Sequence, residues 1–219
     1  MLVIIGLTGP AHSGKSTLAR LLDDHGWRRM SFADPLKDMV RGLLYSCNMS
    51  VGEAEARLYG SRKEEIIPGL GVSSRRLLQF IGTEGGRGAH PDLWLRAMEM
   101  RLANATGKVV IDDVRMDNEA DLIHRMGGRV YRIERSGGAK VEAHASEAGV
   151  ASALIDGVVV NDSDKEDMLD ELTRAMFLAS VNDNQRCGEL LATMPLTLTG
   201  SVQVQLAERP SSSAVASYS

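Results

Sequence analysis

A glycine-rich motif near the start of the chain constrains the fold more than any other feature. Residues 9–17 read GPAHSGKST and fit the pattern G-x-x-x-x-G-K-[ST]. A short apolar run at 2–7 precedes the motif, and leucines at helical spacing follow it. In a strand–turn–helix unit of this kind, backbone amides and the positive end of the helix hold a phosphate. The sequence therefore predicts a site for a nucleoside triphosphate.

Two side chains of the motif have chemical tasks of their own. Lys15 is placed to reach the outer phosphates, and the Ser16 hydroxyl is placed to ligate Mg²⁺. The residues expected to contact the triphosphate are Gly9, His12, Ser13, Gly14, Lys15, Ser16 and Thr17.

The composition is that of an ordinary globular enzyme. The 219 residues are 43% hydrophobic and 25% charged, and the net charge of −4 gives no electrostatic case for a nucleic-acid partner. The two cysteines lack metal-ligand spacing and indicate reduced thiols in a cytoplasm, which is the host cytoplasm if the chain is viral. No stretch approaches the ~20 apolar residues of a membrane helix. The oligomeric state is left open, with a homodimer as one option.

Strand and helix patterns alternate along the chain. Further strands are predicted at 27–32, 108–111, 129–133 and 157–161, and helices at 36–58, at 118–126 and from a capping box at 163–166. Residues 59–74 read as a loop or short helical hairpin, and 75–107 as mostly helical with an interruption at 82–91. Strands separated by helices predict a three-layer α/β fold with a central parallel sheet.

Polar side chains follow the predicted strands at the ends where α/β proteins bind ligands. Asp34 comes after the second strand, where it is expected to cap the next helix. Asp112 and Asp113 follow the third strand, and Arg135 follows the fourth. We expect one of the two adjacent carboxylates to face Mg²⁺ and the other to fix the loop. Asp112, the first after the apolar run, is preferred for the metal.

Arginines gather on the presumed active side of the sheet. They are Arg75, Arg76, Arg87, Arg115 and Arg135. A kinase that acts on a phosphate acceptor binds two anionic groups in one cleft, and guanidinium groups suit that task through paired hydrogen bonds. Arginines also stabilise the charge of a migrating phosphoryl group.

Several segments together resemble the bacteriophage-type deoxynucleoside monophosphate kinases over roughly residues 1–175. In the family's order, they are 9–17, FADPLK at 32–37, RLLQ at 76–79, GTE at 82–84, Arg87, DLW at 92–94, IDDVR at 111–115, NEA at 118–120, HASE at 144–147 and VND at 160–162. The phosphate-binding motif is shared by many families, whereas FADPLK and DDVR are much more specific.

The resemblance implies transfer of the γ-phosphate of ATP, with Mg²⁺, to a deoxynucleoside monophosphate, which yields ADP and the diphosphate for DNA synthesis. It also implies a nucleoside monophosphate kinase fold in residues 1–180. Residues 36–104 would form a helical substrate-binding region and 134–150 a lid. Residues 181–219 are expected to be a partly disordered extension, about which the resemblance says nothing.

The resemblance further implies roles for individual residues. Lys15, Arg115 and Arg135 would be catalytic. The substrate-binding set would be Asp34, Lys37, Arg76, Gln79, Thr83, Glu84, Arg87 and Trp94. Trp94 either stacks on a base or packs in the core. His144, Ser146 and Glu147 are connected only with lid closure.

Two other functions stay open on the sequence. One is a P-loop kinase for another small acceptor, such as dephospho-coenzyme A or phosphomevalonate, in which Asp34 would be the general base if the acceptor were an alcohol. The other is a nucleotide-binding protein without transfer activity, although a pure binder has no need of two anion sites.

Overall fold

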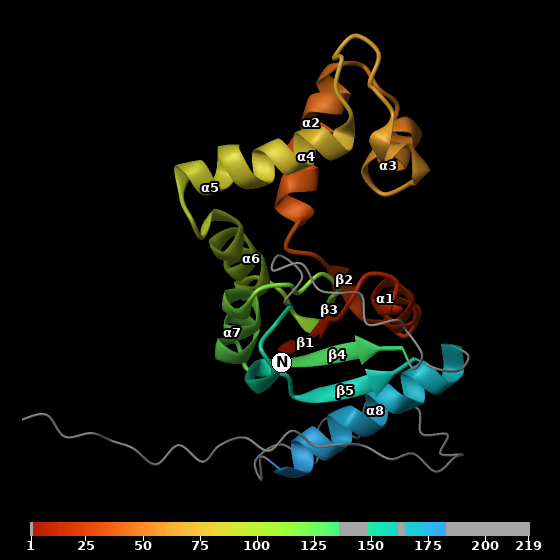
Figure 1. The fold of residues 1–219 in the computed structure, drawn as a ribbon, viewed down its shortest axis with the longest axis vertical. Helices are drawn as coiled ribbons and strands as arrows, with labels where there is room; N and C mark the ends of the chain where they lie inside the picture. The colour runs from red at the N-terminus through yellow and green to blue at the C-terminus, as the bar shows by residue number, and fades with distance from the viewer. Residues whose placement is uncertain (1, 136–148, 162–164, 183–219) are drawn as a thin grey trace, which may run out of the picture.

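The computed structural model describes residues 2–135, 149–161 and 165–182, and within them five strands form one parallel sheet (Figure 1). The strands are β1 (Leu2–Thr8), β2 (Arg28–Met30), β3 (Gly107–Ile111), β4 (Arg129–Glu134) and β5 (Gly157–Val160). Their order is β2-β3-β1-β4-β5, with β1 paired to β3 on one side and to β4 on the other. The three-layer parallel α/β fold expected from the sequence is confirmed, although β2 is shorter than its predicted range of 27–32.

Each face of the sheet has its own apolar core. Ile4 and Val130 pack on one face with α6 (Leu93–Ala103) and α7 (Asp117–Arg125). Their chain neighbours Ile5 and Tyr131 pack on the other face with α1 (Lys15–Asp24) and α8 (Lys165–Asn182). Successive strand residues point to opposite faces, so continuous apolar runs are what a sheet covered on both sides requires.

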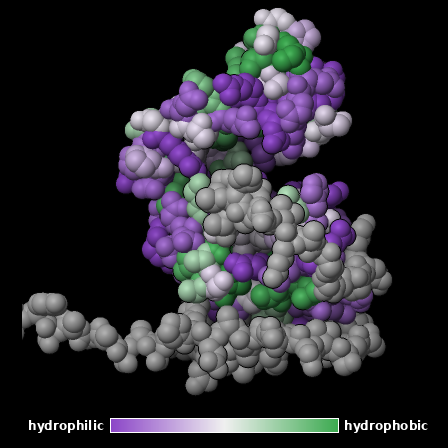
Figure 2. Space-filling view, in the orientation of Figure 1, coloured by the Kyte–Doolittle hydropathy of each residue, from purple (hydrophilic) through white to green (hydrophobic). Residues whose placement is uncertain are grey.

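The chain between β2 and β3 forms a helical insertion with a third apolar cluster. Before α6, its elements are α2 (Asp34–Ser46), α3 (Val51–Leu58), η1 (Ser61–Glu64), α4 (Ser74–Phe80), η2 (Ile81–Gly85) and α5 (Gly86–Ala89). The cluster is built from Val40, Leu44, Ala54, Leu58 and Ile67. Figure 1 shows α2 to α5 standing away from the sheet, and Figure 2 shows that the visible surface of this insertion is mostly hydrophilic.

Helix boundaries in the insertion differ from the sequence prediction at two places. The predicted helix at 36–58 is broken between α2 and α3, where Asn48 has a φ of 58° and the Ser50 hydroxyl accepts a hydrogen bond from Glu53 N at 3.3 Å. This serine cap and the left-handed asparagine start a new helix axis. The interruption predicted at 82–91 is confined to 90–92, because the chain stays helical through the π-helical turn η2 and through α5.

Gly127, which follows α7, has a φ of 77°, a left-handed conformation that commonly ends helices at glycine. Most of the predicted lid, part of the predicted capping box at 163–166 and the chain from 183 onward lie outside the described residues. In the described ranges, no helix combines the length and the apolar character needed to cross a membrane.

Candidate active site

The phosphate-binding loop between β1 and α1 depends on glycines at both ends. Gly9 has a φ of 135°, and a Cβ atom there would lie 2.3 Å from the carbonyl oxygen of Ile133 in β4. Gly14 has a φ of 109°, and a Cβ atom there would lie 2.4 Å from Nδ2 of Asn161. Both positions combine a left-handed backbone with a close neighbour, which only glycine accommodates. The loop is thus fixed against the ends of β4 and β5.

Asn161, at the end of β5, holds the middle of this loop. Its side chain is buried, and Nδ2 donates a hydrogen bond to the carbonyl oxygen of Ser13 at 2.8 Å. Its own backbone N–H donates to the carbonyl of Glu134 at 2.7 Å. Asn161 belongs to the VND segment at 160–162, but no role was predicted for it. An asparagine directly after an apolar strand is the sequence signal that could have identified it.

A cavity of about 370 Å³ opens beside the loop. It is lined by His12, Gly14, Lys15, Ser16, Thr17 and Arg135. Arg135 follows β4, so the fold brings this arginine to the same cavity as the residues expected to hold the triphosphate.

Lys15 is held by the loop from which it comes. Its Nζ donates to the carbonyl oxygens of Gly9 at 2.7 Å and Pro10 at 2.6 Å. Burial, and then the positive charge of Arg115, lower the pKa of Lys15, while the negative charge of Asp112 acts in the opposite direction. Lys15 therefore interacts electrostatically with Arg115 and Asp112, two predicted site residues in the loop after β3.

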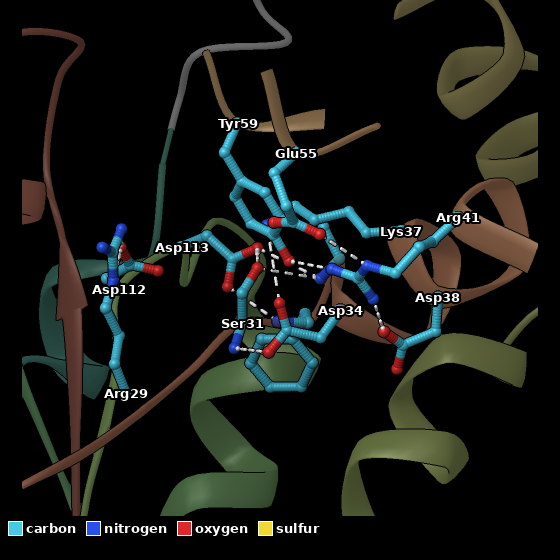
Figure 3. A network of polar contacts seen from close by, with 12 residues as sticks. Arg29, Ser31, Asp34, Lys37, Asp38, Arg41, Glu55, Tyr59, Asp112 and Asp113 are labelled. Carbon is cyan, nitrogen blue, oxygen red and sulfur yellow. Dashed lines mark hydrogen bonds and ion pairs between the residues drawn. The ribbon is translucent and has the colours of Figure 1, made fainter. Parts of the chain in front are cut away.

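Asp112 and Asp113 have different surroundings at the end of β3 (Figure 3). Asp112 is 8% exposed and pairs with Arg29 of β2, whose Nε lies 2.8 Å from Oδ2 and whose Nη2 contacts the same oxygen. In the described part of the chain, Asp112 Oδ1 accepts no hydrogen bond. Arg29 was not predicted as a site residue, because a strand residue gives no local sign of a partner 83 positions away.

Asp113 instead ties the chain after β2 to the chain after β3. Its carboxylate accepts hydrogen bonds from Ser31 Oγ at 2.6 Å, Phe32 N at 2.8 Å and Ala33 N at 3.2 Å. Burial raises the pKa of Asp113, and these three donors oppose the rise. A carboxylate with this many local donors fixes the loop that leads into α2.

Asp34 and Lys37 lie at the start of α2. The prediction that Asp34 caps this helix is wrong, since Asp34 is its first residue and Ala33 occupies the cap position. Asp34 Oδ2 accepts from Ser31 N at 2.8 Å, because the tight turn after β2 directs the carboxylate backward rather than onto the helix amides. Its Oδ1 is 3.5 Å from Lys37 Nζ.

The loop after β3 also contacts the insertion. Glu119 of α7 accepts from the backbone N–H of Arg115 at 2.7 Å and of Met116 at 3.1 Å, which fixes the backbone that carries the exposed Arg115 side chain. Arg87 of α5 donates from Nη2 to Met116 Sδ at 3.4 Å. An arginine of the insertion and Arg115 are therefore brought to one short loop.

The remaining predicted substrate residues lie along α4 to α6. Arg76, Gln79, Thr83 and Glu84 are exposed, and the Thr83 hydroxyl donates to the carbonyl of Gln79 at 2.7 Å.

Trp94 is half-buried near the start of α6, and its two predicted alternatives, stacking on a base and packing in the core, both stay predictions. Its Nε1 donates to the carbonyl of Gly82 at 3.0 Å, and a Cβ atom on Gly86 would lie 2.1 Å from its ring. The indole thus closes the junction between α5 and α6.

His144, Ser146 and Glu147 lie outside the described residues. Within the described ranges, no group of three or more histidine, cysteine, aspartate or glutamate side chains is arranged to hold a metal ion. A Mg²⁺ site that relies on one carboxylate, a hydroxyl and substrate phosphates does not need such a group.

Comparison with solved structures finds similar chains at low sequence identity. TT1252 from Thermus thermophilus is 18% identical, with a TM-score of 0.44 over 82% of this chain and 97% of that one. A dephospho-CoA kinase from Campylobacter jejuni is 14% identical, with a TM-score of 0.42 over 83% of this chain and 100% of that one.

Sequence comparison gives closer relatives. A protein of Acanthamoeba polyphaga mimivirus, provisionally named a deoxynucleotide monophosphate kinase, is 33% identical over 199 residues, which cover 82% of this chain and 98% of the relative. The deoxynucleoside-5′-monophosphate kinase of Escherichia phage T5 is 26% identical over 231 residues, with coverage of 75% and 91%. The family model for deoxynucleotide monophosphate kinase matches residues 63–172, which include the loop after β3. The chain belongs to the deoxynucleotide monophosphate kinase family.

Proposed function

We propose that the chain transfers the γ-phosphate of ATP to the phosphate of a deoxynucleoside 5′-monophosphate, with release of ADP and the deoxynucleoside diphosphate. One observation carries this proposal, namely that cationic groups from separate parts of the chain meet at one edge of the sheet. Burial and then the positive charge of Arg115 lower the pKa of Lys15, so the two cations act on each other electrostatically. Arg87 reaches from the insertion to Met116, the neighbour of Arg115. Two phosphate groups that react with each other require this concentration of positive charge.

The triphosphate side of the site would use the phosphate-binding loop. Its amides and Lys15 would hold the phosphates of ATP, and Arg115 and Arg135 would stabilise the transferred group. Ser16 and Asp112 would hold Mg²⁺, and the chemistry of these donors fits a cation that prefers oxygen ligands. Both contacts of Arg29 go to Oδ2 of Asp112, so Oδ1 can serve the metal directly or through water. When bound, Mg²⁺ would neutralise charge on the phosphates.

The acceptor side of the site would use the insertion, residues 36–104. Arg76 and Arg87 would bind the acceptor phosphate, and Asp34 and Lys37 would lie near the point of transfer. Exposed side chains of α4 and η2, namely Gln79, Thr83 and Glu84, would be available to the sugar or base. The acceptor phosphate is itself an anionic nucleophile, so the reaction needs positioning and charge stabilisation rather than a general base.

Replacement of Asp34 by asparagine separates this proposal from a kinase that acts on an alcohol. An alcohol acceptor would need Asp34 as general base, and its loss would reduce kcat by roughly 10²–10⁴-fold. We expect a reduction below about tenfold, because asparagine can still accept the hydrogen bond from Ser31 N and no proton has to be removed. Steady-state kinetics of ADP release measure the effect.

Asp24→Asn is the control, since Asp24 is exposed at the end of α1 that lies away from the phosphate-binding loop. A loss of more than a hundredfold in Asp34→Asn, with unchanged substrate binding and a normal Asp24→Asn variant, would favour an alcohol acceptor.

A further inference from the structure

Tyr59, directly after α3, lies against the ammonium group of Lys37 on α2 (Figure 3). Lys37 Nζ is 4.6 Å from the centre of the ring, within the range of a cation–π interaction. The Lys37 side chain is only 17% exposed, and its carboxylate partner Asp34 is 3.5 Å away. That separation exceeds the usual length of a charge-assisted hydrogen bond. The ring therefore holds the charge in place without neutralising it.

The ring of Tyr59 is itself held by Arg41. Nη2 of Arg41 donates to the Tyr59 hydroxyl at 3.1 Å, and the guanidinium carbon is 5.8 Å from the ring centre. Arg41 in turn donates from Nε to Glu55 at 2.8 Å and also contacts Asp38. Arg41 therefore supports Tyr59 both at its hydroxyl and at its ring, and the contact with the ring does not depend on the hydroxyl.

The contacts of Lys37 lead back to the edge of the sheet that carries the candidate site. Asp34 accepts from Ser31 N at 2.8 Å, and Ser31 Oγ donates to Asp113 at 2.6 Å. Figure 3 shows Asp113, Ser31 and Asp34 between Asp112 at the left and Lys37 at the right, with Tyr59 above them. The ammonium group is thus anchored beside the ends of β2 and β3.

Two further cations, Lys63 and Arg75, belong to the same electrostatic neighbourhood as this ammonium group. Lys63 lies four residues after Tyr59, and the charges of Lys37 and Arg75 lower its pKa in addition to its partial burial. Of these cations, Arg75 is paired with the exposed Glu64 at 3.0 Å, whereas Lys37 has the long contact with Asp34 beside its contact with the Tyr59 ring. Cations that repel one another in this way gain stability when an anion binds between them.

We propose that Tyr59 is a positioning residue that holds the Lys37 ammonium group where it binds the phosphate of the acceptor nucleotide. The proposal deepens the proposed function and rests on it. Tyr59 does not touch the substrate and acts through the lysine. The ligand of Lys37 is an anionic phosphate ester, and the ring face, rather than the tyrosine hydroxyl, supplies the part that matters for binding.

Aromatic and aliphatic replacements of Tyr59 test this proposal. Tyr59→Phe and Tyr59→Trp keep a π face, whereas Tyr59→Leu and Tyr59→Met remove it. We expect the aliphatic variants to raise the KM for the deoxynucleoside monophosphate about tenfold, a change within the range of a partly desolvated cation–π contact, while the KM for ATP stays unchanged. The aromatic variants should stay within about threefold of wild type. Tyr45→Leu is the matched control, because Tyr45 is also an exposed tyrosine of the insertion.

Thermal unfolding of each variant identifies any that fails to fold, and the second member of each pair then provides the comparison. Equal effects of Tyr59→Phe and Tyr59→Leu, or an equal rise in both KM values, would overturn the proposal.

If wild-type protein forms no ADP with any deoxynucleoside monophosphate, the proposed function fails. Calorimetric binding of dTMP without ATP then decides the role of Tyr59. Tighter binding to wild type and Tyr59→Phe than to Tyr59→Leu supports it, and absent or equal binding contradicts it.

Discussion

Replacing Lys15 with alanine should reduce kcat for ADP formation by about 10²–10³-fold or more and leave the protein folded. When an enzyme loses one preorganised donor that stabilises charge in the transition state, kcat typically falls by this factor. Lys15 is tied to its own loop by two hydrogen bonds to backbone carbonyls and interacts electrostatically with Arg115 and Asp112. Its removal takes away a charge from the centre of the cationic cluster. The stability cost should be small, about 1 kcal/mol per hydrogen bond lost.

Lys108→Ala is the matched control for Lys15→Ala. Lys108 lies near the amino end of β3, whereas the candidate site lies at the carboxyl ends of the strands. The Nζ atom of Lys108 is 5.8 Å from the ring centre of Trp27. We expect it to keep normal turnover. Circular dichroism and thermal unfolding show whether both variants are folded. A folded Lys15→Ala protein with more than a tenth of wild-type kcat would contradict the role given to the phosphate-binding loop.

The two carboxylates after β3 should respond differently to replacement by asparagine. Asp112→Asn should lower kcat by roughly 10²-fold and raise the Mg²⁺ concentration needed for half-maximal rate, since the neutral amide is a poorer ligand for a hard cation. The fold should persist, because asparagine can still accept a hydrogen bond from Arg29. Rates measured across a Mg²⁺ titration test this expectation.

Asp113→Asn should act on stability instead. Its carboxylate accepts three hydrogen bonds from Ser31, Phe32 and Ala33, and an amide group can satisfy only some of these donors. We expect a loss of about 1–3 kcal/mol in the free energy of unfolding, the cost of leaving a buried donor unsatisfied. Urea unfolding measures it. If the Mg²⁺ concentration needed for half-maximal rate changed in Asp113→Asn and stayed constant in Asp112→Asn, the roles given to the two carboxylates would be reversed.

The sheet could be predicted from the sequence because its information is local. Strands covered on both faces leave continuous apolar runs, and four of the five observed strands lie within about one residue of their predicted positions. The phosphate-binding loop is equally local, since its glycines, Lys15 and Ser16 lie within nine residues. Its place at the carboxyl edge follows from parallel topology alone.

The parts that sequence reasoning missed depend on contacts between distant residues. Asn161 holds the phosphate-binding loop through Ser13, which is 148 positions away. Arg29 of β2 pairs with Asp112, which follows the neighbouring strand β3. Tyr59 meets Lys37 only because α2 and α3 turn back on each other at Asn48, a left-handed residue within a helical pattern. Periodicity in one sequence carries no record of such pairings.

The most direct test of the account is ADP release by the full chain with Mg-ATP in the presence of dAMP, dGMP, dCMP, dTMP and their ribose counterparts. We predict ADP formation with at least one deoxynucleoside monophosphate, in equal molar amount with the corresponding diphosphate and absent when the acceptor is omitted. Protein that binds ATP but forms no ADP above background with any deoxynucleoside monophosphate would contradict the account.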